Sequence, residues 1–178
     1  MATHLLEDPN FERTVVVVLE HNDEGALGVV LNRPSALALD DALPEWAPLA
    51  PAPAAVFVGG PVAKGAVIAI ARLKRFEEHT LPEGTWNPIV AGVGVLDLGV
   101  EAGAVEPALD ALRVFTGYAG WGSGQLEAEI AEGAWWVVQA DVDDALTPQP
   151  AALWRTVLRR QRSPLNRFAL YPHDVGSN

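Results

Sequence analysis

Cysteine is absent from this chain of 178 residues, and basic residues are scarce beside acidic ones. Without a thiol there can be no disulfide, no cysteine nucleophile and no zinc site built on sulfur. The 12 Lys and Arg against 23 Asp and Glu give a formal net charge of −11, which argues against direct nucleic-acid binding, because that affinity rests on neutralising phosphates. Long hydrophobic runs are also missing, since the most apolar one, at residues 15–19, is far too short to cross a bilayer.

Common catalytic and metal-binding motifs are missing as well. The four histidines form no H-x-x-x-H or H-x-H pair, so no histidine-rich metal site is expected: they are His4, His21, His79 and His173. Ser123 lies in GWGSG rather than G-x-S-x-G, and the glycine-rich stretches at 60–66 and 117–124 fit neither the P-loop nor the Rossmann pattern. We therefore expect no metal and no cofactor, and the lack of a recognisable catalytic constellation favours a non-enzymatic protein.

The composition that remains is that of a folded globular protein, with 49% hydrophobic and 20% charged residues. Its length suits one domain, so residues 1–178 are treated as a single domain. Residues 1–9 lack the basic and apolar stretches of a secretory signal, and we expect a cytoplasmic protein without a membrane segment. Residues 145–178 hold 5 basic and 1 acidic residue, a local charge of 5 − 1 = +4, which suits docking on an acidic surface.

Two β-branched apolar runs, TVVVVLE at 14–20 and ALGVVLN at 26–32, are predicted strands. The polar loop HNDEG between them favours an antiparallel hairpin, and Pro34 is expected to end the second strand. Further strands are predicted at 55–58, 66–71, 89–98, 112–116 and 134–140, with an edge strand at 168–171. Helices are predicted at 40–46, 106–111, 125–132 and 147–161, and a surface loop at 74–88. Hairpins are too frequent for a βαβ array, so the predicted class is α+β with a mixed, largely antiparallel sheet.

The hairpin predicts a cluster of polar side chains at its open end. Antiparallel pairing places Arg13, which precedes the first strand, near Asn32 and Arg33, which end the second. Because Arg offers a bidentate fork, one interpretation is a site for a carboxylate or another small anion. The favoured interpretation pairs Arg13 or Arg33 with nearby acids, since structural ion pairs gather the same residue types. The candidate acids are Asp8, Glu127 and Glu129.

A second candidate group stands among the glycines before the predicted helix at 125–132. Trp121 and Gln125 could line a ligand groove, or they could be a core side chain and a helix cap, and the sequence does not separate these alternatives. Trp121 and Gln125 are therefore kept with Arg13, Asn32 and Arg33 as candidate ligand-binding residues.

Three segments together carry a family resemblance: DPNFERTVVVVLEH at 8–21, GALGVVLNRP at 25–34 and GYAGWGSGQLEAE at 117–129, with FVGGPV at 57–62 between them. This combination closely resembles the YqgE/AlgH family of bacterial proteins, and order and spacing match from near Met1 to about Pro172. The sequence departs from the family pattern at its start, because only MATHLLE precedes Asp8 where family members carry an apolar strand. A missing strand would leave a sheet edge exposed.

The resemblance implies a curved mixed sheet with helices packed around it. It also implies a regulatory protein, because the family is named partly for a proposed role in regulating alginate synthesis genes, and it brings no agreed catalytic residues. We therefore expect a non-enzymatic regulatory or binding protein that acts through an unknown protein partner or a small anionic ligand. The alternative is a small-anion-binding protein or an uncharacterised enzyme that uses Arg13, Asn32 and Arg33. Direct DNA binding by the basic segment at 155–162 ranks third, and a homo-oligomer is left open.

Overall fold

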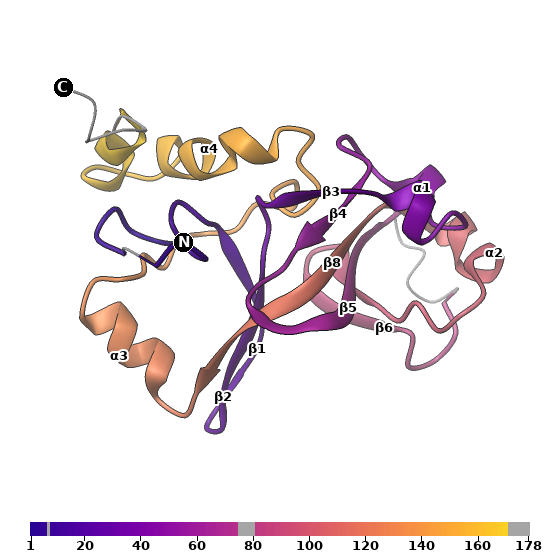
Figure 1. Ribbon diagram of the computed structural model, residues 1–178, viewed down its shortest axis with the longest axis horizontal. Coiled ribbons are helices and arrows are strands. Elements are labelled where there is room, and N and C mark those ends of the chain that lie inside the picture. The colour runs from indigo at the N-terminus through magenta and orange to yellow at the C-terminus, as the bar shows by residue number, and fades with distance from the viewer. Residues whose placement is uncertain (7, 75–80, 171–178) are drawn as a thin grey trace.

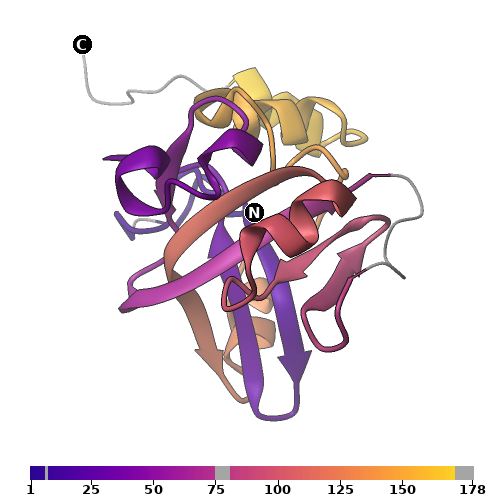
Figure 2. The same ribbon diagram turned by 90° about the vertical axis from the view of Figure 1, so that its right-hand side faces the viewer.

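Eight strands form one largely antiparallel sheet in the computed structural model, which describes residues 1–6, 8–74 and 81–170. In chain order the strands are β1 (Val16–Asn22), β2 (Gly25–Val30), β3 (Pro34–Ala38), β4 (Ala55–Val58), β5 (Val62–Leu73), β6 (Trp86–Val90), β7 (Val93–Leu96) and β8 (Leu109–Gly122). The main path runs β1-β2-β8-β5-β7-β6, while β4 pairs with both β8 and β3 (Figure 1). Only the β4–β8 pair is parallel among the described strands, and β8 arches across the sheet (Figure 2). The predicted α+β class with a curved mixed sheet is confirmed.

The helices are short and lie around the sheet. They are α1 (Leu39–Ala42), α2 (Ala102–Val105), α3 (Gln125–Ala131) and α4 (Leu153–Arg159), with 3₁₀ turns at Ala47–Leu49, Glu106–Ala108, Pro150–Ala152 and Leu165–Leu170. α3 matches its predicted range. The helix predicted at 40–46 ends at Ala42, two residues before Pro44, and the one at 147–161 is the 3₁₀ turn Pro150–Ala152 followed by α4. The helix predicted at 106–111 is wrong, because only the 3₁₀ turn Glu106–Ala108 forms and β8 begins at Leu109. None of the helices within the described ranges is long and apolar enough to cross a membrane.

The predicted hairpin is confirmed: β1 and β2 pair antiparallel, with Val16 opposite Val30 and Asn22 opposite Gly25. Asp23 and Glu24 alone connect the strands, so the turn is tighter than the predicted loop. The prediction that Pro34 ends the second strand is wrong. β2 already ends at Val30, and Pro34 is the first residue of β3. A proline is tolerated at a strand's first position, where no ladder donor is lost.

Glycines in FVGGPV and GYAGWGSG allow two chain segments to cross closely. A Cβ on Gly60 would lie 2.2 Å from the backbone of Tyr118, and a Cβ on Gly59 would lie 2.3 Å from the carbonyl oxygen of Gly117. Gly117 itself has a φ of 67°, a conformation that favours glycine. The glycine-rich stretch at 117–122 is therefore the second half of β8.

Two predicted strands are wrong, and one is divided. Residues 134–140 contribute only the bridge between Trp135 and Ala2, because no full strand of the described part of the chain lies beside them. The edge strand at 168–171 is replaced over its described part by the 3₁₀ turn Leu165–Leu170, which packs against α4. The strand at 89–98 is divided into β6 and β7 by Gly92, whose φ of 72° allows a turn. β6 takes the last residues of the predicted loop at 74–88, of which 75–80 lie outside the described residues.

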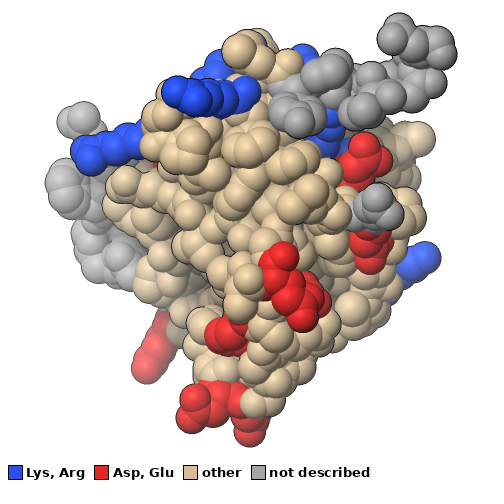
Figure 3. Space-filling model, turned by 90° about the vertical axis from the view of Figure 1, so that its left-hand side faces the viewer, with Lys and Arg blue, Asp and Glu red and all other residues tan. Residues whose placement is uncertain are grey.

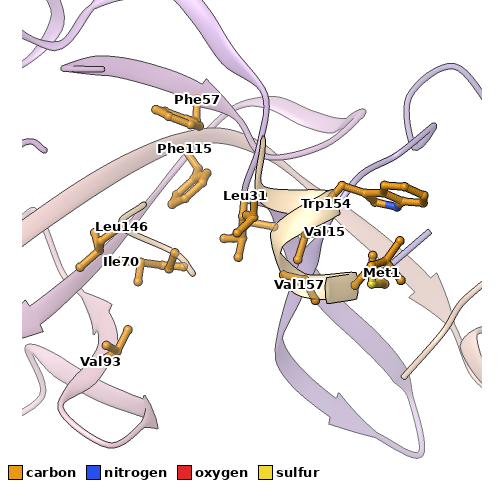
Figure 4. Packing of buried hydrophobic residues seen from close by; sticks show 14 of the residues in the cluster. Met1, Val15, Leu31, Phe57, Ile70, Val93, Phe115, Leu146, Trp154 and Val157 are labelled. Carbon is orange, nitrogen blue, oxygen red and sulfur yellow. The ribbon is translucent and has the colours of Figure 1, made fainter. Parts of the chain in front are cut away.

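The hydrophobic core joins the sheet to α4. Phe57 and Phe115 meet edge to face with ring centroids 5.8 Å apart, and Val157 and Leu158 of α4 are fully buried against the same cluster (Figure 4). Leu153 and Trp154 are buried on the same helix, so α4 presents one apolar stripe to the core. The opposite face of α4 lies outside the core. It carries Arg155 and Arg159, which are half-buried and exposed, respectively.

Arg113 is a buried cation inside this core. Its guanidinium donates to the carbonyl oxygens of Ala52, Ala145 and Thr147, and it lies 4.2 Å from the centroid of the Phe57 ring. Burial lowers the pKa of Arg113 to about 10, so the side chain stays protonated at neutral pH. Arg113 thus ties two loops to β8, which is a structural task.

Candidate functional site

A hollow of about 480 Å³ lies where α4 meets the open end of the β1–β2 hairpin. We call it the arginine hollow, and its lining comprises Glu12, Arg13, Asn32, Arg33, Pro34, Ala151, Trp154 and Arg155. Three sequence-predicted residues, Arg13, Asn32 and Arg33, therefore lie together as the antiparallel pairing requires. The helix adds a third guanidinium and an indole that the hairpin alone does not supply.

Asn32 holds the two ends of the hairpin together. Its Oδ1 accepts the backbone N–H of Val15 at 3.0 Å, and its Nδ2 donates to the carbonyl oxygen of Arg13 at 2.9 Å. The oxygen and the nitrogen of the buried Asn32 amide are thus both hydrogen-bonded to backbone groups. Buried polar atoms need such partners. Asn32 consequently acts as a positioning residue for Arg13 and Arg33 rather than as a ligand contact.

The three arginines reach the hollow from different segments and are all half-buried. Arg13 has a φ of 50°, a left-handed conformation that is uncommon outside glycine, and its guanidinium carbon lies 5.4 Å from the centroid of the Trp154 ring. The indole Nε1 of Trp154 donates to the carbonyl oxygen of Ala2 at 2.9 Å, which fixes the ring. Arg33 donates to the carbonyl oxygen of Glu12. Guanidinium groups held in this way can bind a carboxylate or phosphate in bidentate fashion.

The acids expected to neutralise Arg13 or Arg33 are Asp8, Glu127 and Glu129, and each accepts hydrogen bonds from another residue. Asp8 Oδ1 accepts from the backbone N–H of Asn10 at 2.8 Å and from its Nδ2 at 3.0 Å. Glu127 pairs with His21 at the surface, and hydrogen bonds from its own backbone N–H and from His21 lower the pKa of Glu127. Glu129 accepts hydrogen bonds from the indole Nε1 of Trp121 at 2.9 Å and of Trp135 at 2.7 Å. None of the three carboxylates lines the arginine hollow.

Trp121 and Gln125, the other two candidates, belong to this second cluster, which we call the indole–carboxylate cluster: Trp121, Gln125, Glu129 and Trp135. Gln125 Nε2 donates to Glu129 at 2.8 Å, while its Oε1 accepts the backbone N–H of Gly122 at 3.0 Å. Burial raises the pKa of Glu129, but hydrogen bonds from Trp135, Gln125 and Trp121 outweigh that effect, so the net pKa is lowered. The polar groups of this cluster bind one another. Trp121 is buried but also lines an apolar cavity, and Gln125 does not cap α3, whose N-cap is Gly124 without a side-chain hydrogen bond.

Sequence reasoning missed Trp154 and Arg155 as members of the site. In the sequence, Trp154 belongs to the apolar side of a predicted helix and Arg155 to its polar side, and neither pattern indicates a binding site. Only the packing of α4 over the hairpin brings them beside Arg13. Within the described ranges, no group of three His, Asp or Glu side chains is arranged to hold a metal ion.

Comparison with known proteins places this chain in a family. A sequence model described as AlgH-like matches residues 1–166, and the chain belongs to that family. A UPF0301 protein of Streptomyces coelicolor is 46% identical over 178 residues, which cover 100% of this chain and 92% of that protein. Another, from Thermobifida fusca, is also 46% identical, over 187 residues that cover 100% of this chain and 92% of that one. The resemblance identified from the sequence is thereby confirmed.

Two solved structures share the fold. A crystal structure of a Corynebacterium diphtheriae protein superposes with a TM-score of 0.89 at 28% identity, covering 96% of this chain and 89% of that one. The solution structure of the AlgH protein from Pseudomonas aeruginosa gives a TM-score of 0.63 at 31% identity, covering 85% and 81%. The names of these relatives assign no reaction, so the function has to be argued from the site.

Proposed function

We propose that this AlgH-like protein is a non-enzymatic, cytoplasmic regulatory protein that binds an anionic group in the arginine hollow. One observation carries the proposal: three half-buried guanidiniums and a fixed indole converge on one open hollow. The ligand class is a carboxylate or phosphate group, on a small molecule or on an acidic partner protein. Arginine suits such groups because its planar fork makes two parallel hydrogen bonds to them.

The charge distribution supports a selective anion site on an otherwise acidic molecule. Figure 3 shows basic side chains gathered at the top of one face, the end that carries α4, and acidic ones mainly toward the bottom. The net charge of −11 weakens nonspecific attraction to nucleic acid, so regulation through a bound ligand or a protein partner is favoured over direct DNA binding.

The alternative of an enzyme using Arg13, Asn32 and Arg33 has less support. Both polar ends of the Asn32 amide already bind backbone groups. Glu12 is the one acid among the described residues that line the hollow, and it is exposed to solvent. A general base requires a group poised by its surroundings near the reacting atom, and the hollow offers none among its described side chains.

The test uses two arginines of one helix. Thermal unfolding is followed at low ionic strength with increasing inorganic pyrophosphate, and separately with citrate, for the wild type, Arg155→Met and Arg159→Met. Arg155 lines the hollow, whereas Arg159 is exposed on the same helix outside it. A ligand that binds the native state raises the melting temperature with concentration. We expect this rise in the wild type and in Arg159→Met and a much smaller one in Arg155→Met.

The opposite outcomes are equally clear. The proposal would be overturned if neither anion raised the melting temperature of the wild type. It would also be overturned if Arg155→Met and Arg159→Met reduced that rise equally, since the effect would then come from the net charge of the helix rather than from the hollow. Sustained turnover of a substrate that is abolished by Arg33→Met would instead establish the enzyme.

A further inference from the structure

The basic surface around the arginine hollow continues along α4 beyond Arg155. Arg155 lines the hollow, and Arg159 follows it four residues later on the same helix. Side chains at this spacing lie on one side of a helix, with Cβ atoms about 6 Å apart. Val157 and Leu158 are buried on the other side, whereas Arg159 is exposed. The hollow is therefore one end of a longer line of positive charge.

The helix and the turns around it supply no acid to neutralise this charge. Residues 145–170 contain five arginines and no Asp or Glu. Arg160 is already bound, because it donates to both carboxylate oxygens of Asp144 and to the carbonyl oxygen of Gln139. Arg159 and Arg162 are exposed, and their side chains form no hydrogen bond or ion pair with a described residue. We call the arginine hollow together with Arg159 and Arg162 the extended basic surface.

The spacing of the arginines fits acidic side chains on an extended peptide. In an extended chain, alternate side chains point the same way and lie about 6.6 Å apart. That distance is close to the roughly 6 Å between Arg155 and Arg159 along one side of α4. One carboxylate of an extended segment can thus enter the hollow while the carboxylate two residues further on reaches Arg159. A single small anion would fill the hollow and leave Arg159 without a ligand group.

The acidic remainder of the molecule favours a short segment over nucleic acid. Figure 3 shows basic side chains at the top of one face and acidic ones mainly toward the bottom. Charges separated by more than about 8 Å are largely screened at physiological salt, so a short segment at the top meets little repulsion from below. A DNA duplex carries one charge per about 1.7 Å of its length and extends past the basic end over the acidic parts.

We propose that the extended basic surface binds a segment of a partner protein that is extended and carries acidic residues at alternate positions. One carboxylate lies in the arginine hollow and the next lies on Arg159. The residue between them points away from α4 and is not selected. This inference rests on the proposed function, since it names the carrier of the anionic group that the hollow binds.

The experiment compares two dye-labelled peptides of identical composition at physiological salt. In Glu-Ala-Glu-Ala-Glu-Ala-Ala-amide the acids alternate, whereas in Glu-Ala-Ala-Glu-Ala-Ala-Glu-amide successive acids lie on opposite sides of an extended chain. Fluorescence anisotropy measures the binding of each peptide to the full-length wild type, to Arg159→Met and to Lys64→Met. Lys64 is exposed on β5 and does not line the hollow, so its variant removes the same charge elsewhere. Thermal unfolding with inorganic pyrophosphate is measured on the same three proteins.

The alternating peptide should bind the wild type more tightly than the spaced peptide. We expect Arg159→Met to weaken the alternating peptide by about three- to fivefold, as the loss of one exposed ion pair does, and to leave the spaced peptide unchanged. Lys64→Met should bind both peptides as the wild type does. Pyrophosphate should raise the melting temperature of all three proteins equally, because it occupies only the hollow. Circular dichroism confirms that each variant is folded.

Several outcomes would overturn the inference. Equal binding of the two peptides, or equal weakening by Arg159→Met and Lys64→Met, would show attraction by general charge. Tighter binding of the spaced peptide would indicate a helical partner, and tighter binding of a 12-base-pair DNA duplex would assign the surface to nucleic acid. If pyrophosphate stabilises the protein but the alternating peptide does not bind, this inference falls and the anion site remains. If pyrophosphate has no effect either, the proposed function falls with it.

Discussion

The arginine hollow and the indole–carboxylate cluster both gather polar side chains, but they arrange these side chains differently. In the cluster, each polar group meets another within the protein: one carboxylate accepts from Trp121, Trp135 and Gln125. In the hollow, guanidiniums from three segments line a space of about 480 Å³. Both groups were candidates by residue type, and the difference teaches that a binding site is recognised by where its polar groups point, not by which residues it contains.

The cluster should be the more costly to disrupt. Glu129→Ala leaves two indole N–H groups in a largely buried setting without their acceptor, and each such loss costs about 1–3 kcal/mol. We expect the free energy of unfolding to fall by about 2–4 kcal/mol, measured by urea denaturation. Glu132→Ala, at the exposed end of the same helix, is the control and should change it little. A loss below that of the control would mean that these hydrogen bonds do not hold the cluster.

Asn32→Ala should come second, because it removes one acceptor and one donor that hold the hairpin ends. The expected loss is about 1–3 kcal/mol of unfolding free energy. Because Asn32 positions Arg13 and Arg33, anion binding should weaken as well, and calorimetric titration with pyrophosphate measures this. Unchanged stability together with lost binding would make Asn32 a direct ligand contact and contradict its positioning role.

The pH dependence should separate the two regions next. The lowered pKa of Glu129 means that its ionised form is favoured in the folded protein, so its contribution to stability is present above the ordinary value of 4.5 and is lost as pH falls through the lowered pKa. The stability difference between wild type and Glu129→Gln should therefore shrink in acid. Urea denaturation at neutral and acidic pH measures this difference, and a difference that grew in acid would have the wrong sign.

The smallest effect on stability belongs to the hollow. Arg33 is half-buried and its guanidinium donates to one carbonyl oxygen, so Arg33→Met should change the unfolding free energy by only about 0.5 kcal/mol. The stabilisation by added pyrophosphate should nevertheless be reduced. A large loss of stability without ligand would place Arg33 with the structural residues.

Local sequence was enough to predict the features that depend on two strands adjacent in the chain. The runs at 14–20 and 26–32 predict the hairpin, and the hairpin alone brings Arg13, Asn32 and Arg33 together. Packing decides the rest. Trp154 and Arg155 join the site because α4 crosses the hairpin end, about 120 residues later in the chain.

The wrong strand at 134–140 and the unassigned glycines have the same cause. GYAGWGSG fits no nucleotide-binding motif, and its glycines are needed where Gly59 and Gly60 pass close to β8. Residues 134–140 have the composition of a strand, but residues 1–3 pair with only the first part of it. Neither the crossing nor the missing neighbour is visible in the segment itself.

The central claim is that the hollow binds anions while the polar groups of the cluster bind one another, and one NMR titration tests both halves. Inorganic pyrophosphate is added to ¹⁵N-labelled protein while the arginine Nε–H and tryptophan Nε1–H signals are followed. The account predicts that signals of Arg13, Arg33 and Arg155 shift together and saturate, while the Trp121 and Trp135 indoles stay in place. Indole signals that move with the arginines, or arginine signals that do not move, would contradict it.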